Sequence, residues 1–315
     1  TIVVSKCLEF DACRYNGEMI PDVTIRNLQP FVTFIPVCPE VEIGLGTPRE
    51  TIRIVEENGE NRLVQPSTRE DVTEKMEQFS NDFLQTIPDV DGFILKNRSP
   101  SCGTRDVKIY SGFEKAPAKG KGSGLFGGAV VKKFSHLPIE EEGRLSNFII
   151  REHFFTRLFT IAYYKMIKHN KNMKDLVSFQ SDNKYLFMAY NQVKQKELGR
   201  IIANHKNEKI EVVFENYEKT LYELFMRTPR YTSNVNVCEH IFGYFKTKLK
   251  KQEKDHFIEL LQKYAEKKIP LSSLLTILKS WAIRFDEKYL LRQTYFEPYP
   301  EALVEISDSG KGRDY

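Results

Sequence analysis

Three cysteines each end or closely follow an apolar run typical of a buried strand. Cys7 ends TIVVSKC, Cys38 ends FVTFIPVC, and Cys102 lies in SPSCG, which begins one residue after VDGFILKN. Ligands of an open α/β sheet bind outside the carboxyl ends of its strands, so these thiols can meet although 31 and 64 residues separate them. Zinc fingers and ferredoxins use close CxxC pairs instead. The pattern therefore predicts a shared metal or cluster site, with three buried structural cysteines as the alternative.

Such convergence requires a parallel sheet, and the first half of the sequence has the matching pattern. The apolar runs flank the segment STREDVTEKMEQFSNDFLQTI, in which a Ser67 or Thr68 cap, early acidic residues and helical apolar spacing predict a helix. Continuous apolar strands that alternate with helices are typical of a sheet covered on both faces. We therefore expect an α/β domain with a mostly parallel sheet.

The pattern changes near LPIEEEGRL, residues 137–145. Beyond it, Phe, Leu, Ile and Tyr recur every three or four residues and strand signals are nearly absent, which predicts an all-helical domain with breaks at Pro229 and Pro270. A length of 315 residues is enough for two domains. The expected division is an α/β domain at 1–145, an all-α domain at 146–305 and a polar tail at 306–315.

Composition excludes several classes of protein. Hydrophobic residues at 41% and charged residues at 29% argue against a disordered chain, and an odd count of five cysteines argues against a disulfide framework. No window offers 18 apolar residues free of charge, so no membrane partner is expected, and the start lacks a signal peptide pattern, so the cytoplasm is the expected compartment. Residues 1–150 carry 18 basic against 22 acidic side chains, and residues 151–315 carry 29 against 21. The basic second half is compatible with an anionic partner such as RNA, and also with an ordinary surface.

A basic, glycine-rich stretch follows SPSCG directly. Residues 98–133 hold eight Lys and Arg against two acids, and KGKGSGLFGGAV enters a predicted helix. Its backbone amides and lysines could hold phosphate, although it lacks the register of a nucleotide-triphosphate P-loop. We expect this stretch to contact an RNA backbone, with a flexible solvated loop as the alternative. The basic residues assigned to substrate binding are Arg98, Lys108, Lys119 and Lys121.

Three segments together resemble the thiouracil desulfidase (TudS-like) family: SKCLEFDACRYNG, FIPVCPEVEIGLGTPRE and RSPSCG. The junction HLPIEEEGRL and the segments KELGRIIA, NVCEHIFGYFK and YLLRQTYFEPYP are similar to the YbgA-like helical domain found fused to that family. The resemblance implies a 4Fe-4S cluster on Cys7, Cys38 and Cys102 with one open iron. It also implies that the chain desulfurates 4-thiouridine in tRNA, and that Glu40 and Ser101 line the pocket beside the cluster.

An iron with an open position can act as a Lewis acid, and sulfur is a soft donor that iron–sulfur iron accepts readily. A thiocarbonyl bound through sulfur becomes open to water at its ring carbon, the C–S bond then breaks and sulfide leaves without net redox change. Glu40 is the expected general acid and base, with Glu42 as the alternate; a capping role or a pair with a nearby Arg is the structural alternative for Glu40. Ser101 is expected to orient the ring or the water, or to serve only the turn.

Arg14 and Tyr15 follow the first strand and are expected to stack on or clamp the nucleotide, unless they are merely solvated. Cys13 stands where the family usually has an apolar residue. It is expected to be a free thiol, but as a fourth ligand it would close the cluster and favour a non-catalytic iron–sulfur sensor or RNA-binding protein. A desulfidase of free 2-thiouracil is the other alternative, against which the extra basic domain argues.

Overall fold

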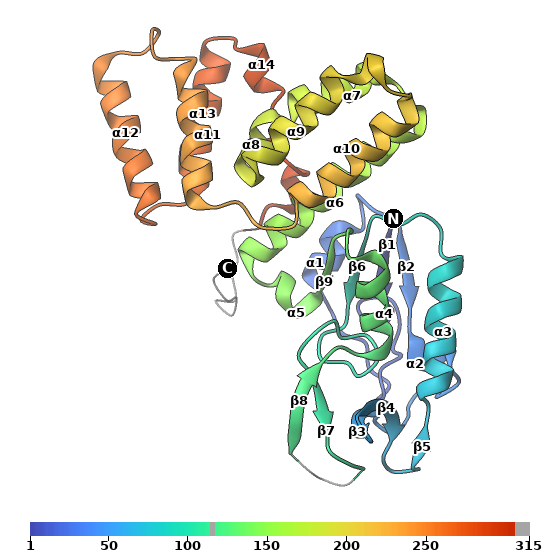
Figure 1. Ribbon diagram of the computed structural model, residues 1–315. Helices are drawn as coiled ribbons and strands as arrows, with labels where there is room; N and C mark the ends of the chain where they lie inside the picture. The colour runs from blue at the N-terminus through green and yellow to red at the C-terminus, as the bar shows by residue number, and fades with distance from the viewer. Residues whose placement is uncertain (114–116, 306–315) are drawn as a thin grey trace. The chain divides into compact units, whose positions relative to one another are not determined.

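The computed structural model describes residues 1–113 and 117–305, so the predicted tail at 306–315 lies outside the described part. The described chain divides into two compact units, residues 1–158 with 302–305 and residues 159–301 (Figure 1). The division falls inside one continuous helix, α6 (Phe148–Asn170). The boundary predicted at residue 145 marks the end of a short preceding helix, α5 (Glu142–Leu145).

A four-stranded parallel sheet forms the centre of the first unit. Its order is β2-β1-β6-β9, and all three pairings are parallel. The strands are β1 (Ile2–Ser5), β2 (Phe34–Val37), β6 (Gly92–Leu95) and β9 (Ile139–Glu141). The residues of β1 and β6 are all buried, as expected for strands covered on both faces. The predicted α/β class with a parallel sheet is confirmed, and the carboxyl ends of β1, β2 and β6 lie at one edge.

A second sheet of five strands, which the sequence pattern did not predict, follows the order β5-β4-β3-β7-β8. Its strands are β3 (Arg53–Glu57), β4 (Glu60–Gln65), β5 (Glu70–Asp71), β7 (Val107–Tyr110) and β8 (Ala118–Gly122). Only the β3–β7 pair is parallel. Asn58 and Gly59, both at positive φ, turn β3 into β4. An Asn-Gly pair between two strand-like runs is a strong hairpin signal, so this part was readable from the sequence.

Among the described residues, five helices belong wholly to the first unit: α1 (Val23–Leu28), α2 (Pro39–Glu42), α3 (Thr73–Thr86), α4 (Leu125–Phe134) and α5. The rings of Phe79 and Phe83 on α3 meet Phe126 on α4, with centroids 6.2 and 5.8 Å away. The helix expected from residue 67 or 68 begins at Thr73. That start was wrong because Glu70 and Asp71 pair with β4 as a short strand.

Every regular element in the described part of residues 146–305 is helical, which confirms the predicted all-α second half. After α6 come α7 (Met173–Asp182), α8 (Lys184–Tyr190), α9 (Gln192–Ala203), α10 (Ile210–Leu224), α11 (Tyr231–Gly243), α12 (Lys251–Ala265), α13 (Leu271–Arg284) and α14 (Lys288–Leu291), with 3-10 turns at His205–Asn207 and Glu301–Leu303. The predicted breaks at Pro229 and Pro270 fall between helices. Among the helices of the described residues, none combines the length and apolarity needed to cross a bilayer.

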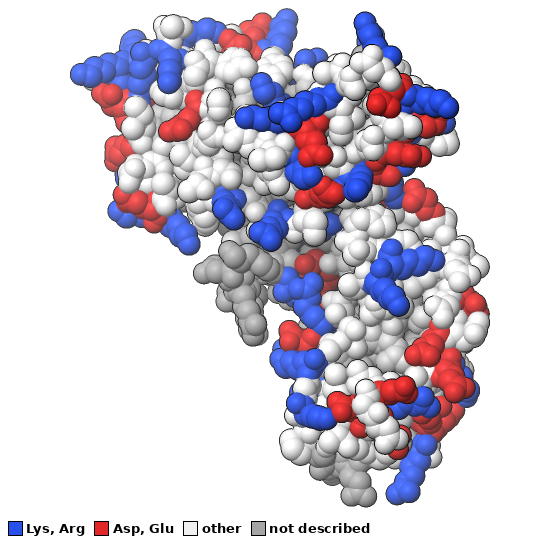
Figure 2. Space-filling view, viewed as in Figure 1, with Lys and Arg blue, Asp and Glu red and all other residues white. Residues whose placement is uncertain are grey.

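Aromatic side chains dominate the core of the helical unit. Tyr164 stacks on Tyr217 with ring centroids 5.4 Å apart, and its hydroxyl donates to the carbonyl of Phe214. On the face seen in Figure 2, the basic side chains of this unit are interleaved with acidic ones. The aromatic residues that recur at helical spacing in the sequence thus form the core of this unit. Its excess of positive charge is dispersed on the face that Figure 2 shows.

Candidate functional site

Four of the five cysteines line one cavity at the carboxyl edge of the parallel sheet. Cys7, Cys13, Cys38 and Cys102 all face a space of about 350 Å³. In the parallel register Ser5 lies opposite Val37, and Val4 lies opposite Ile94, so the loops after β1, β2 and β6 leave the sheet side by side. The predicted convergence of three distant thiols is therefore present in the fold.

A different local backbone structure positions each of the three predicted cysteine ligands. Cys7 sits in the turn after β1, where its carbonyl accepts from Ile20 N at 2.8 Å. Cys38 is the N-cap residue of α2, with Pro39 at the first helical position. Cys102 lies in a turn in which its amide donates to Ser99 Oγ at 3.1 Å. Each thiol is therefore placed by backbone structure that begins where a strand ends.

The glycine-rich segment before α4 supports the Cys102 turn. The amides of Gly124, Leu125 and Gly127 donate to the carbonyls of Gly103, Pro100 and Ser101, at 2.7, 3.2 and 2.9 Å. A Cβ at Gly124 or Gly127 would lie within 3.0 Å of backbone atoms of this turn. The amides of Gly124, Leu125 and Gly127 are thus already bonded to protein carbonyls, so these three are not available to hold phosphate. The glycines allow close approach of two backbones instead.

Burial lowers the acidity of three thiols at the cavity, Cys7, Cys13 and Cys102. It raises the pKa of Cys102 to about 12, and it raises the pKa of Cys13 to about 12 with a further contribution from Cys38. The pKa of Cys7 is also raised, first by burial and then by the neighbouring Cys102. Metal ligation requires thiolates, so binding of a metal group at this site must displace protons.

The donor set suits an iron–sulfur cluster. Thiolates are soft ligands that select such clusters, and three of them reach the cavity from three separate loops. Within residues 1–113 and 117–305, no group of three or more His, Cys, Asp or Glu side chains is placed to hold a single metal ion. Ligands of a cluster each bind a different iron and need not meet at one point, so three thiols on separate loops around one cavity fit a cluster. Cys7, Cys38 and Cys102 could hold it.

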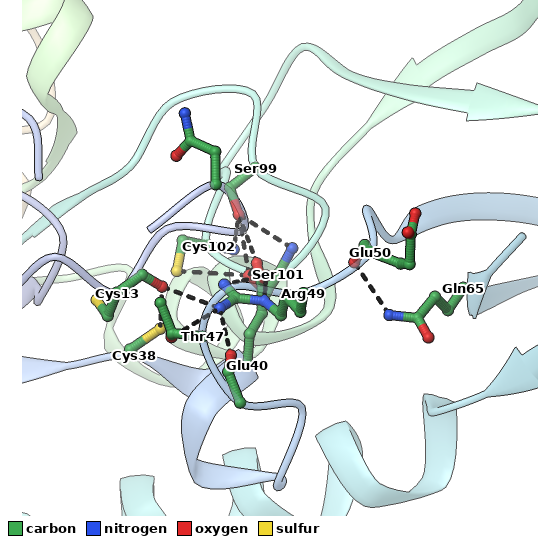
Figure 3. Close-up of polar contacts among 12 residues, drawn as sticks. Cys13, Cys38, Glu40, Thr47, Arg49, Glu50, Gln65, Ser99, Ser101 and Cys102 are labelled. Atoms are coloured by element: carbon green, nitrogen blue, oxygen red, sulfur yellow. Dashed lines mark hydrogen bonds and ion pairs between the residues drawn. The ribbon is translucent and has the colours of Figure 1, made fainter. Parts of the chain in front are cut away.

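Glu40 lies beside the cysteines with both carboxylate oxygens engaged (Figure 3). Its Oε2 accepts from Arg49 Nη2 at 2.6 Å and from Arg49 Nε at 2.9 Å. Its Oε1 accepts from Ser101 Oγ at 2.6 Å and lies 3.5 Å from Ser99 Oγ. The Arg49 side chain is 4% exposed and that of Glu40 13%. Glu40 therefore makes the ion pair that was its structural alternative while still lining the cavity; Glu42, the alternate, is exposed and does not.

Ser101 is the serine expected both to line the pocket and to orient the substrate, but in the structure Ser99 and Ser101 have different positions. Ser101 is fully buried and does not line the cavity, but it holds Glu40 and lies 3.7 Å from Cys102 Sγ. Ser99 does line the cavity, and its Oγ is 2.9 Å from that of Ser101. A hydroxyl has a single proton to donate. Ser101 is thus placed to position Glu40, and Ser99 is the serine that can reach a ligand.

Arg14, Tyr15 and Arg98 also line the cavity. The Arg14 guanidinium lies 5.5 Å from the centre of the Tyr15 ring, and Tyr15 is 43% exposed. The Tyr15 carbonyl accepts from Arg49 N at 2.8 Å, which ties this loop to the glutamate pair. The structure therefore brings all three predicted substrate-binding residues of this region to the cavity.

Three of the four basic residues predicted to bind substrate, Arg98, Lys108 and Lys121, line a second cavity of about 580 Å³ that adjoins the first. Thr51, Ile52, Arg98 and Pro100 line both. The charged and aromatic residues of the second cavity are Arg53, Arg98, Asp106, Lys108, Tyr110 and Lys121. Lys121 pairs with Asp106 at 3.2 Å, and the Arg53 guanidinium lies 4.8 Å from the Tyr110 ring centre. Lys119 lies outside both cavities and pairs with Glu56 at 2.5 Å.

Sequence reasoning missed three residues that line the first cavity. Arg49 and Ser99 contact Glu40, and Lys96 pairs with Glu142. Ser99 lies within the motif SPSCG, so its position beside Cys102 was a usable signal. Arg49 follows the turn GLGTP, and nothing in that segment indicates that its side chain folds back on Glu40.

Comparisons with known proteins agree with this site. Residues 2–142 match the family model for 2-thiouracil desulfurase, and residues 184–300 match a domain of unknown function, DUF1722. An uncharacterized protein of Bacillus subtilis, YbbK, is 36% identical over 118 residues, which span 35% of this chain and 77% of that protein. An uncharacterized protein of Escherichia coli, YbgA, is 23% identical over 156 residues, 49% of this chain and 92% of that protein.

A solved structure of the [4Fe-4S]-dependent thiouracil desulfidase TudS covers 46% of this chain and 92% of its own chain, at 26% identity and a TM-score of 0.37. The 2-thiouracil desulfurase model covers the residues that carry the four cavity cysteines, and the DUF1722 model lies within the helical half. The chain therefore belongs to the 2-thiouracil desulfurase family and carries a YbgA-like helical domain after its desulfurase domain.

Proposed function

We propose that the chain is an iron–sulfur-dependent desulfidase that hydrolyses the thiocarbonyl of a thiolated uridine in tRNA, such as 4-thiouridine, to uridine and sulfide. The observation that carries the proposal is the placement of Cys7, Cys38, Cys102 and Glu40 around one cavity of about 350 Å³. Membership of the 2-thiouracil desulfurase family supports the chemistry. A cavity of this volume is at the lower end of the range for small-molecule sites, which suits a pyrimidine ring.

Cys7, Cys38 and Cys102 would hold a [4Fe-4S] cluster, which when bound would supply an iron that accepts a soft sulfur donor as a Lewis acid. The chain's own residues must then manage water and protons. Hydrolysis consumes one water, forms a C–O bond, breaks the C–S bond and releases sulfide, so the water must lose its protons as the leaving sulfur gains one. We assign both transfers to Glu40, because it lines the cavity and its Oε1 lies 3.5 Å from the hydroxyl of Ser99, which lines the cavity too.

Arg49 and Ser101 position this carboxylate and hold it at the cavity wall. Ser99 offers a hydroxyl to the ring or to the attacking water, and Tyr15 offers an aromatic face for the base.

The second cavity favours a nucleotide within RNA over a free base. It adjoins the first and presents Arg53, Arg98, Lys108 and Lys121, which suits the phosphates on either side of a base held at the cysteines. A desulfidase of free thiouracil is the second candidate, favoured by the base-sized first cavity. A non-catalytic sensor, closed by Cys13 as a fourth ligand, is the third, since Cys13 lines the same cavity.

The test measures sulfide release by the full chain after anaerobic cluster reconstitution, with iron counted in each sample. We expect a higher kcat/KM with tRNA that contains 4-thiouridine than with free 4-thiouracil or 2-thiouracil. Glu40→Gln should lower kcat by about 10²- to 10⁴-fold at unchanged iron content. Glu42→Gln is the matched control and should retain activity, because Glu42 is exposed and does not line the cavity.

Two results would contradict the proposal. An iron-loaded protein that releases no sulfide from any of the three substrates is not a desulfidase of this kind. A Cys13→Ala protein that keeps its iron but loses turnover would reject the assignment of Cys13 as a free thiol. Turnover equal to that of the unmodified protein would exclude Cys13 as a fourth ligand of the cluster.

A further inference from the structure

We propose that Cys13 and Cys38 form an oxidisable thiol pair, which a small disulfide converts into an intramolecular disulfide that blocks assembly of a cluster on Cys38. The pair is a modification site beyond the proposed desulfidase activity. Its chemistry is thiol–disulfide exchange with a low-molecular-weight disulfide as the oxidant.

The two thiols are direct neighbours. Cys38 Sγ donates to the carbonyl oxygen of Cys13 at 3.8 Å (Figure 3), and the two side chains face the same cavity. They are 4% and 8% exposed, yet both line the cavity, through which a small reagent can reach them. The two residues are 25 positions apart in sequence, so the fold itself creates the pair.

The backbone on both sides holds the pair in place. Arg49 Nη1 donates to the Cys13 carbonyl at 3.0 Å and to the Gly46 carbonyl at 2.9 Å. Cys38 is fixed as the cap of α2, where its carbonyl accepts from Val41 N at 3.0 Å. Hydrogen bonds therefore anchor both backbones beside the cavity that the two thiols share.

The reaction balances with one equivalent of small disulfide. The first protein thiol attacks it, forms a mixed disulfide and releases one small thiol; the second protein thiol then attacks the mixed disulfide and releases the other. The S–S bond of the reagent breaks, the Cys13–Cys38 bond forms, and two electrons and two protons pass to the reagent. A sulfur held in this bond cannot act as an iron ligand, so disulfide and cluster exclude each other at Cys38.

The test uses the full chain, with any iron removed by chelation under anaerobic conditions, and bis(2-hydroxyethyl) disulfide as the oxidant. Thiols are counted after denaturation, and linked peptides are mapped by mass spectrometry without reduction. The count should fall by two from the five cysteines of the chain, leaving three, with Cys13 linked to Cys38. Subsequent iron incorporation should fall at least several-fold and should recover after treatment with dithiothreitol.

Cysteine variants test whether the disulfide involves Cys13 and no other thiol of the chain. Cys13→Ala and Cys13→Val should each keep all four remaining thiols and take up iron equally before and after the oxidant. Cys238→Ser, which alters a thiol buried in the helical unit, should still lose two thiols. Circular dichroism and the iron uptake of reduced samples confirm that each variant is folded.

A linkage of Cys7 to Cys102 in place of Cys13 to Cys38, or an unchanged thiol count, would overturn the proposal. An oxidised protein that still takes up a full complement of iron would overturn the claim of exclusion. None of these measurements requires turnover, so failure of the desulfidase proposal and failure of this one are separate results.

Discussion

Replacement of Arg49 should be far more damaging than its place in a polar loop suggests. Its guanidinium bonds Glu40 through Nε and Nη2 and the carbonyls of Cys13 and Gly46 through Nη1, and its side chain is 4% exposed. Arg49→Ala leaves Glu40 as a nearly buried charge without its partner. Breaking such a pair from one side costs about 3–5 kcal/mol, because the desolvated charge that remains is uncompensated.

An exposed ion pair in the same unit provides the comparison for the loss of stability. Arg62 and Asp71 are joined at 2.8 Å with side chains 33% and 35% exposed, so solvent screens this pair and Arg62→Ala should destabilise the unit far less than Arg49→Ala. The loss in Arg49→Lys should fall between those of the two alanine variants, because one ammonium group keeps the charge but cannot span Glu40 and both carbonyls. The kcat of Arg49→Ala should also drop by about 10²-fold, the effect of displacing a reacting group by about 1 Å.

The assay must report on the first unit alone. Trp281, the single tryptophan, lies in the helical unit and does not follow the region of interest. Hydrogen exchange of peptides from β1 and β2 in increasing urea measures the local free energy of unfolding directly. Equal losses in Arg49→Ala and Arg62→Ala would refute the reasoning, and so would a full kcat in Arg49→Ala alongside an inactive Glu40→Gln.

Three further predictions concern backbone packing, protonation and the second cavity. Gly127→Ala should destabilise the protein by about 1–3 kcal/mol in urea unfolding, since its Cβ meets the Cys102 turn, whereas Gly199→Ala, with nothing within 4 Å, should stabilise it by about 0.5–1 kcal/mol. Burial lowers the pKa of His153 to about 3, so the unfolded chain binds this proton first; the free energy of unfolding should fall by at most about 1.4 kcal/mol per pH unit between about pH 6 and 3, and His153→Gln should reduce that slope. Lys108→Gln with Lys121→Gln should weaken tRNA binding and lower its salt dependence by about one unit of log–log slope for each phosphate that is no longer neutralised, while turnover of free 4-thiouracil stays unchanged.

The parts of the fold that could be predicted are those in which local sequence and long-range packing agree. The strands before Cys7, Cys38 and Cys102 are continuous apolar runs followed by a turn, and two of them, β1 and β6, are buried along their whole length. The helical half was equally readable because its aromatic core recurs at helical spacing. The second sheet was missed because its strands are mostly polar; β8, for example, is AKGKG, and only pairing with β7 makes it a strand.

The candidate site divides in the same way. Cysteines at strand ends and the glutamate of PVCPE are placed by elements that can be predicted. The partners of Glu40 are not, because Arg49 reaches it from an irregular loop and Ser99 is distinguished from Ser101 only by which hydroxyl faces the cavity. The glycine-rich segment was misread because flexibility and close approach of backbones call for the same residue. The packing of Gly127 against the Cys102 turn decides between them.

Arg49 links the two proposals for this site. One edge of its guanidinium holds the carboxylate of Glu40, and its Nη1 holds the backbone of Cys13 beside Cys38. A single substitution should therefore disturb two measurable properties, the kcat of sulfide release and the rate at which the Cys13–Cys38 disulfide forms. Glu40→Gln should change only the first and Cys13→Val only the second. If Arg49→Lys slowed turnover while disulfide formation kept its original rate, the loop of Cys13 would be held by something other than Arg49, and the glutamate and the thiol pair would have to be treated as independent.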